Sequence, residues 1–78
     1  MMRVKLSDGT KGSKYRIDKI LLDASVTRRF YALGMTQNTE LAVLNIKKSG
    51  PAIIKVRGTR FAVGRKFCEG IYVRGNGE

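Results

Sequence analysis

Residues 28–73, RRFYALGMTQNTELAVLNIKKSGPAIIKVRGTRFAVGRKFCEGIYV, form the stretch of this chain that decides its fold. A short helix is expected to end at Leu33-Gly34-Met35, because glycine suits the left-handed position that closes a helix. Short apolar runs separated by glycine-containing turns then predict strands. The elements expected after the helix are strands over 41–46, 52–56 and 59–63, a helical turn within 64–70, and a last strand over 71–73.

The segment before this stretch predicts one strand and the beginning of the helix. Val4 and Leu6 are compatible with a short strand, and from Lys14 the apolar residues alternate with period two, as in a strand. The alternation changes phase at Asp18-Lys19, which indicates a bulge. The helix is expected over residues 24–33, with Asp23 or Ser25 as the cap and Val26, Phe30 and Leu33 on one apolar face.

The two sharpest turns and the helical turn carry specific expectations. Arg57-Gly58 is predicted to be a tight turn between two strands, and residues 47–50 a hairpin loop. Phe61 alternates in phase with Val63, so both are expected to face the core. The helical turn within 64–70 is expected to direct Phe67 inward.

These elements predict a mainly β protein, a small curved barrel with one short helix between the first and second strands and a helical turn before the last strand. A length of 78 residues allows one domain, 1–78. Residues 1–10 and 75–78 are expected to be flexible within it.

The charge of the chain is strongly basic but evenly distributed. Sixteen lysines and arginines against six acidic residues give a net charge of +10, with no block of five like charges. Three interpretations remain open: a surface coat that keeps a small protein soluble, contact with an acidic protein or a membrane surface, and nucleic-acid binding. Because the bases are dispersed, we favour the surface coat and rank nucleic acid last.

Composition also indicates the compartment. The single cysteine, Cys68, excludes an internal disulfide and fits a reducing environment. No apolar stretch approaches the ~18 residues of a membrane span, and the N-terminus lacks the apolar core of a signal peptide. We therefore expect a cytoplasmic protein that does not insert into the membrane, although a partner can recruit it to the inner face.

The chain offers little that could run chemistry. It contains no histidine, the commonest general base and metal ligand, and its carboxylates do not pair at helical spacing. No phosphate-binding glycine loop is present. Cys68 is interpreted as a packed residue, with a thiol-based sensor as the alternative. The prediction is a non-enzymatic protein with no cofactor and no metal site.

The helix end is the strongest candidate for a functional surface. Its plain interpretation is a helix stop with a hydrophobic contact over the cap. Its functional interpretation is an exposed apolar knob rimmed by arginine, the usual composition of a protein-binding patch. Together with the basic hairpin tip, the candidate partner-binding residues are Arg28, Arg29, Leu33, Met35, Arg57 and Arg60.

A barrel that binds RNA is the alternative from a different class. Arg57-Gly58-Thr59-Arg60 resembles an RNA-binding tract in charge, and such barrels combine bases with exposed aromatic rings. With Phe61 assigned to the core, only Tyr15, Tyr31 and Tyr72 are left as stacking candidates. A stacking platform is therefore not expected.

The order of several short motifs resembles one known family. R-R-F-x-x-L-G-M, then a strand, then K-x-G-P-x-I-I-x-V-x-G-T-x-F-A-V, then I-x-V, is similar to the FeoA family of ferrous iron transport proteins over about residues 6–74. The single motifs are weak, but their order and spacing together are specific. Cys68 departs from the pattern, which usually has alanine there.

The resemblance implies an SH3-like barrel in the cytoplasm and a role in iron homeostasis. Its implied partner is FeoB, the membrane ferrous iron transporter with a cytosolic G-protein domain, whose iron uptake it would modulate by contact. It implies no catalysis. The family is linked to a transition metal, yet the absence of histidine argues against a strong Fe(II) site in this chain. Weak self-association and the sign of the regulation are left open.

Overall fold

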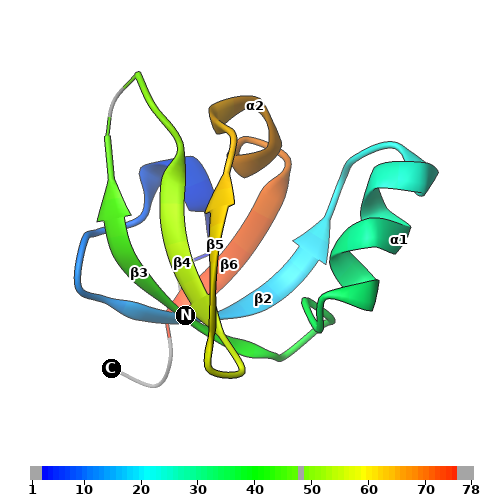
Figure 1. Cartoon of the computed structure of the whole chain (residues 1–78), viewed down its shortest axis with the longest axis horizontal. Helices are drawn as coiled ribbons and strands as arrows, with labels where there is room; N and C mark the ends of the chain where they lie inside the picture. Colours follow the sequence, from blue (N-terminus) through cyan, green and yellow to red (C-terminus); the bar gives the residue numbers. More distant parts are fainter. Residues whose placement is uncertain (1–2, 48, 76–78) are drawn as a thin grey trace.

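The computed structural model describes residues 3–47 and 49–75, whose six strands curl around one core with a helix beside them (Figure 1). Lys48 in the expected hairpin loop and residues 76–78 of the expected tail lie outside the described residues. The helical elements are a 3-10 turn η1 (Leu6–Asp8), α1 (Ala24–Ala32) and α2 (Arg65–Cys68). The strands are β1 (Arg3–Lys5), β2 (Lys14–Ile20), β3 (Glu40–Ile46), β4 (Ala52–Val56), β5 (Thr59–Val63) and β6 (Ile71–Gly75).

The strands form one antiparallel sheet in the order β1-β6-β2-β3-β4-β5. The mainly β prediction is confirmed, and so is the helical turn before the last strand. Helix α1 was expected after the first strand but follows the second, β2. The reason is that residues Arg3–Lys5 form an additional strand, β1, which pairs with β6. Leu6, which follows that strand, is fully buried.

The bulge expected in β2 is confirmed. The pairing of β2 with β6 shifts register between Ile17 and Lys19, which is where the apolar alternation of the sequence changes phase. A bulge increases local twist and bends the strand. The bend lets β2 pair with β6 along its length while its first residues also pair with β3.

The inward side chains of the sheet, the helix end and α2 share one apolar core. No polar or charged side chain among the described residues is buried in it. Such a core is stabilised mainly by the removal of apolar surface from water. Its members are Leu6, Ile17, Phe30, Met35, Leu41, Val43, Ala52, Ile54, Val56, Val63, Cys68, Ile71 and Val73.

Helix α1 ends in the way that the sequence predicts. Gly34 has a φ of 93°, its N–H donates to the carbonyl of Tyr31, and the N–H of Met35 donates to the carbonyl of Phe30. These two bonds define a Schellman motif, in which the residue after the glycine also makes an apolar contact with the helix. At the other end, Asp23 is the N-cap residue, although its side chain makes no capping hydrogen bond.

The β4–β5 hairpin turns in two residues. Arg57 and Gly58 both have positive φ, 52° and 82°, the combination of a type I′ turn. The tight turn predicted from the glycine is confirmed, and Arg57 shares the left-handed conformation. Val63 is buried, and Phe61 is partly buried against the core, as their common phase predicts.

The prediction for α2 was wrong about Phe67. Its side chain is 42% exposed, and Cys68 takes the buried position instead. A four-residue helix directs one residue inward, and the smaller thiol fits the space under the sheet. Phe67 packs edge-on to Phe30 of α1, with 6.0 Å between ring centroids.

Replacing Gly34 with alanine tests the helix end. We expect Gly34→Ala to lower the free energy of unfolding by about 1–2 kcal/mol, because a Cβ is strained at positive φ. Denaturant unfolding followed by circular dichroism measures this. Gly50→Ala is the matched control: Gly50 is not among the positive-φ glycines, and its change should stay below about 1 kcal/mol. Equal losses in the two variants would contradict the prediction.

Candidate partner-binding surface

The carboxylate of Asp18 is held by two arginine side chains. Asp18 in β2 accepts a hydrogen bond from Arg3 at 2.8 Å and lies 3.3 Å from Nε of Arg74. Arg74 also donates to the side chain of Asn38. These contacts connect β1, β2, β6 and the loop before β3. Asp18 therefore serves as a cross-strand tie.

A metal centre has no side-chain basis in the part of the chain that the structure describes. Within residues 3–47 and 49–75, no three histidine, cysteine, aspartate or glutamate side chains gather as a possible ligand group. Fe(II) sites in proteins are commonly built from histidine and carboxylate ligands.

Cys68 lies in the core and not at the surface. Its thiol is 3.5 Å from the carbonyl oxygen of Val63, to which it can donate, and it is 1% exposed. Burial raises the pKa of the Cys68 thiol above its usual value, and the nearby Arg65 only partly opposes this. A neutral, enclosed thiol is a packing group, which favours the structural interpretation over the sensor.

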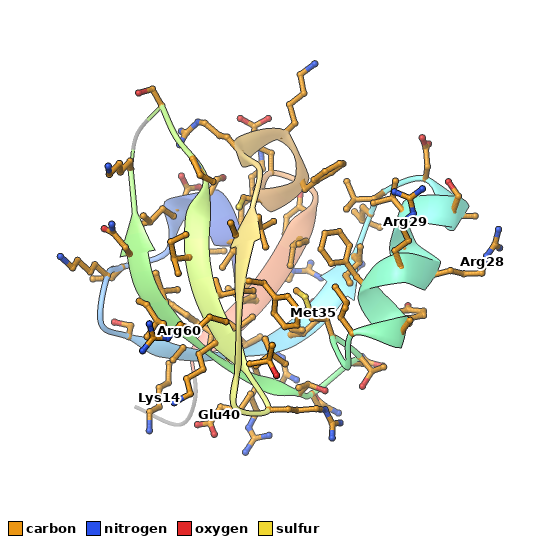
Figure 2. The ribbon with its side chains drawn as sticks, viewed as in Figure 1. Lys14, Arg28, Arg29, Met35, Glu40 and Arg60 are labelled. Carbon is orange, nitrogen blue, oxygen red and sulfur yellow. The ribbon has the colours of Figure 1, made fainter. Side chains whose placement is uncertain are left out.

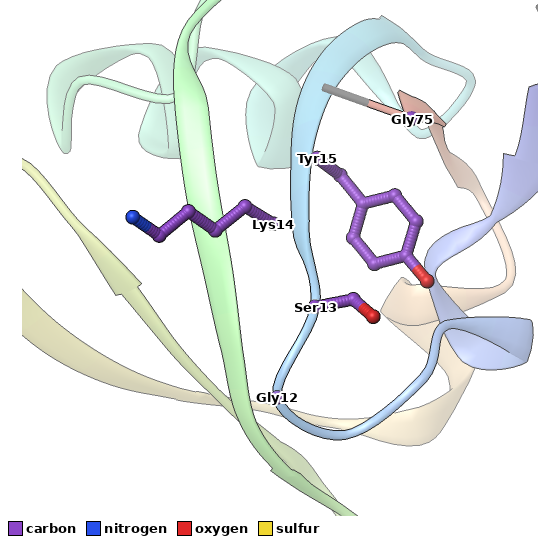
Figure 3. Close-up of a pocket in the computed structure, with 5 residues that line it drawn as sticks. All are labelled: Gly12, Ser13, Lys14, Tyr15 and Gly75. Atoms are coloured by element: carbon purple, nitrogen blue, oxygen red, sulfur yellow. The ribbon is translucent and has the colours of Figure 1, made fainter. Parts of the chain in front are cut away.

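An open depression of about 550 Å³ lies beside the start of β2 (Figure 3). Tyr15 and Lys14 leave the strand in opposite directions there, as the strand period requires. The hydroxyl of Tyr15 accepts a hydrogen bond from the backbone N–H of Thr10 at 2.9 Å. The ring therefore stabilises a loop. Of the described residues, those that line the depression are Gly12, Ser13, Lys14, Tyr15 and Gly75.

The tyrosines do not form a platform for stacked bases. Tyr15 is held by its loop contact in β2, and Tyr72 in β6 lies under the guanidinium of Arg3, 5.9 Å from the ring centroid. Tyr31 lies on α1 and is 49% exposed. No contact between these rings is found among the described residues, so the RNA interpretation gains no support from their arrangement.

The end of α1 is the exposed apolar surface that the sequence indicates, with one correction. Leu33 is 45% exposed, Arg28 and Arg29 are exposed, and Arg28 points away from the barrel (Figure 2). The inclusion of Met35 was wrong, because its side chain is 0% exposed. The Schellman motif turns the chain back at Gly34 and directs Met35 into the core beside Phe30.

The hairpin tip reaches the same end of the molecule. Nε of Arg57 lies 3.4 Å from the carbonyl oxygen of Gly34, to which it donates. A methyl group at Gly34 would lie 2.7 Å from Cδ of Arg57. The structure thus brings Arg57 against Gly34, the residue that follows Leu33, although the two are far apart in sequence. We call Arg28, Arg29, Tyr31, Leu33 and Arg57 the helix-end patch.

Arg60 is separated from this patch. Arg60 pairs in register with Lys55 on β4. Lys55 in turn pairs with Ala42 on β3, and Ala42 pairs with Lys14 on β2. Figure 2 shows Arg60, Lys14 and Glu40 together on the side of the barrel opposite to α1. The six residues predicted from sequence are therefore divided among two surfaces and the core.

Tyr31 is the member of the helix-end patch that sequence reasoning missed. It lies off the Val26-Phe30-Leu33 stripe, and this position was itself the signal that its ring would point outward. The row of Lys14, Lys55 and Arg60 was also missed. Strand register, which the sequence does not display, brings these three together.

The comparisons with known proteins agree on one family. The FeoA domain profile matches residues 4–75. A crystal structure of an iron uptake regulatory protein (FeoA) superposes with a TM-score of 0.86 at 33% identity, covering 94% of this chain and 97% of that one. A FeoA protein from Chlorobium tepidum gives 0.86 at 27% identity, covering 94% and 70% respectively. No curated protein sequence matches significantly.

A further likeness concerns the fold alone. A manganese-dependent transcriptional repressor superposes with a TM-score of 0.85 at 19% identity, and the match covers 94% of this chain but 41% of the repressor. The same barrel thus forms part of a longer protein. Among the described residues of the present chain, no helix is long and apolar enough to cross a membrane.

Thiol labelling tests the placement of Cys68. Because the raised pKa keeps the thiol protonated near neutral pH, we expect slow reaction with a disulfide reagent such as DTNB in the folded protein. In denaturant the reaction should be at least about tenfold faster, because the reagent then reaches the thiol and the effect of burial on its pKa is lost. Equal rates in the two states would show that the Cys68 thiol is accessible in the folded protein, and would favour the sensor interpretation.

Proposed function

Because the chain belongs to the FeoA family, which is associated with ferrous iron transport, we propose that it is a small cytoplasmic accessory protein of ferrous iron uptake. In this proposal it binds the cytosolic part of the FeoB transporter, which contains the G-protein domain, and modulates transport. It acts by contact and not as an enzyme. It would be recruited to the inner face of the membrane by that partner.

The observation that carries the proposal is the composition of the helix-end patch. Tyr31 and Leu33 keep about half of their side-chain surface in water, although apolar side chains are usually removed from it. Arginine and tyrosine are enriched in protein interfaces, where they contribute a large share of the binding energy. The patch offers both residue types, together with the aliphatic Leu33, at exposed positions of α1 and its C-terminal end.

The rigidity of the patch also supports docking. Leu33 closes α1, and its N–H donates to the carbonyls of Arg29 and Phe30. Arg57 is held against Gly34 by the hairpin tip. A preformed patch loses less conformational entropy when a partner binds than a mobile one does.

Charge reversal at Arg28 and Arg29 tests the proposal. The Arg28→Glu/Arg29→Glu variant should bind the purified cytosolic domain of FeoB about tenfold or more weakly, since rim charges govern association and its salt dependence. Isothermal titration calorimetry gives the affinity, and iron uptake by cells that carry the variant gives the functional readout.

The matched control is Lys5→Glu/Lys11→Glu, which makes the same change in net charge at exposed positions outside the patch. It should bind like the parent protein. Equal weakening by both variants would mean that binding depends on net charge and would refute the patch. If the parent protein does not bind the FeoB domain at all, the proposed partner is wrong.

A further inference from the structure

Strand β5 is the last strand of the sheet. Within the described chain it pairs with β4 on one side and with no strand on the other, as Figure 1 shows. The unpaired side of an edge strand presents backbone N–H and C=O groups that can bind another extended chain. The five residues of β5 are long enough for several such bonds.

The register of the hairpin identifies the groups that point outward. In a two-residue type I′ hairpin the flanking pair, here Val56 and Thr59, is hydrogen-bonded. Bonded and non-bonded pairs alternate along an antiparallel ladder, so Phe61 and Val63 also bond to β4. The N–H and C=O groups of Arg60 and Ala62 therefore face away from β4, toward the free edge.

The two edges of the sheet differ in their protection. Proteins protect edge strands by keeping them short, by adding lysines or by inserting proline. Strand β1 at the other edge has three residues, of which Arg3 and Lys5 are basic. Strand β5 is longer, contains no proline, and has Arg60 as its single charge.

The face beside the β5 edge is basic. Three exposed basic side chains occupy one row across the sheet: Arg60, Lys55 and Lys14. The small Ala42 lies in the same row between Lys55 and Lys14. Adjacent strands lie about 4.8 Å apart, so the row spans roughly 14 Å. Glu40 is the acidic residue nearby on β3, where it pairs in register with Arg16. The row therefore favours an anionic occupant.

We propose that the free edge of β5 accepts an extended acidic segment of a partner protein as an added strand. The N–H and C=O groups of Arg60 and Ala62 bond to the backbone of this segment. The partner residue opposite Arg60 carries a carboxylate on the outer face. The next residue of the partner segment points to the inner face of the sheet, beside the partly buried Phe61, and is apolar.

A second copy of this chain is a poor occupant. Antiparallel pairing of two β5 edges would bring two basic rows together, and like charges across strands are destabilising. The proposed segment has the opposite charge and alternates acidic with apolar residues. The basic row borders the helix-end patch at Arg57, which lines a depression together with Lys14 and Lys55. Arg60 and the edge groups of β5 are not part of that patch, and the inference does not depend on FeoB as the partner.

The probe is a short acetylated and amidated peptide of alternating glutamate and valine, one residue longer than β5. The first control peptide alternates lysine and valine, which reverses the charge. The second alternates glutamate and proline, which keeps the charge but cannot pair as a strand. ¹H–¹⁵N NMR titration of the full chain measures affinity, and amide hydrogen exchange locates the new bonds. We expect the glutamate–valine peptide alone to slow exchange at Arg60 and Ala62.

Two variants test the backbone and the charge separately. Ala62→Pro removes an outward N–H without removing a bond to β4, and should weaken peptide binding about fivefold, as expected for a lost hydrogen bond. Ala62→Ser, which keeps the N–H, should bind like the parent. Arg60→Glu keeps the edge but reverses its charge, and should weaken binding about tenfold. Lys19→Glu is its matched control.

Several results would overturn the inference. Equal binding of the glutamate–proline peptide would show attraction by charge without strand addition. Equal binding of the lysine–valine peptide would remove the preference for acid. Protection of Arg60 and Ala62 without peptide, lost on dilution, would identify a second copy as the occupant. Absence of any binding would also refute the edge site, and none of these results depends on FeoB.

Discussion

The packing of one small apolar core is the constraint on which every other feature of this domain depends. Thirteen side chains are buried, and no polar or charged side chain of the described residues is among them. A chain of 78 residues buries a modest share of its surface, so each large apolar residue matters to stability. The Schellman motif brings Met35 into this core, and the bulge in β2 lets the sheet curve around it.

Because the core excludes charge, the basic residues that the structure describes, all of the sixteen except Lys48, remain at the surface or partly exposed there. The fold then sorts them. Arg3 and Arg74 hold Asp18, Arg57 approaches the helix end, and Lys55 and Arg60 share a row on the outer face of the sheet. A charge that looks uniform along the sequence thus separates into a structural tie and the two surfaces that are proposed to bind partners.

The features that sequence reasoning predicted correctly depend on local chemistry. Gly34 ends a helix because a left-handed residue is needed there, and Arg57-Gly58 turns because its neighbours alternate as strands. The errors at Met35 and Phe67 concern which way a side chain points after a turn. Local pattern does not decide this, because the space left by distant strands determines whether a thioether, a thiol or a ring is buried.

The sequence by itself determined the class of fold, the positions of its turns and the lack of histidine for catalysis or metal binding, since these follow from periodicity, backbone preference and residue type. The tertiary structure alone decided which residues form a surface. It placed Arg57 against Gly34 at the helix end, buried Met35 in the core, and aligned Lys14, Lys55 and Arg60. The physical reason is that strand register and core packing join residues distant in the chain, and neither leaves a mark on the local sequence.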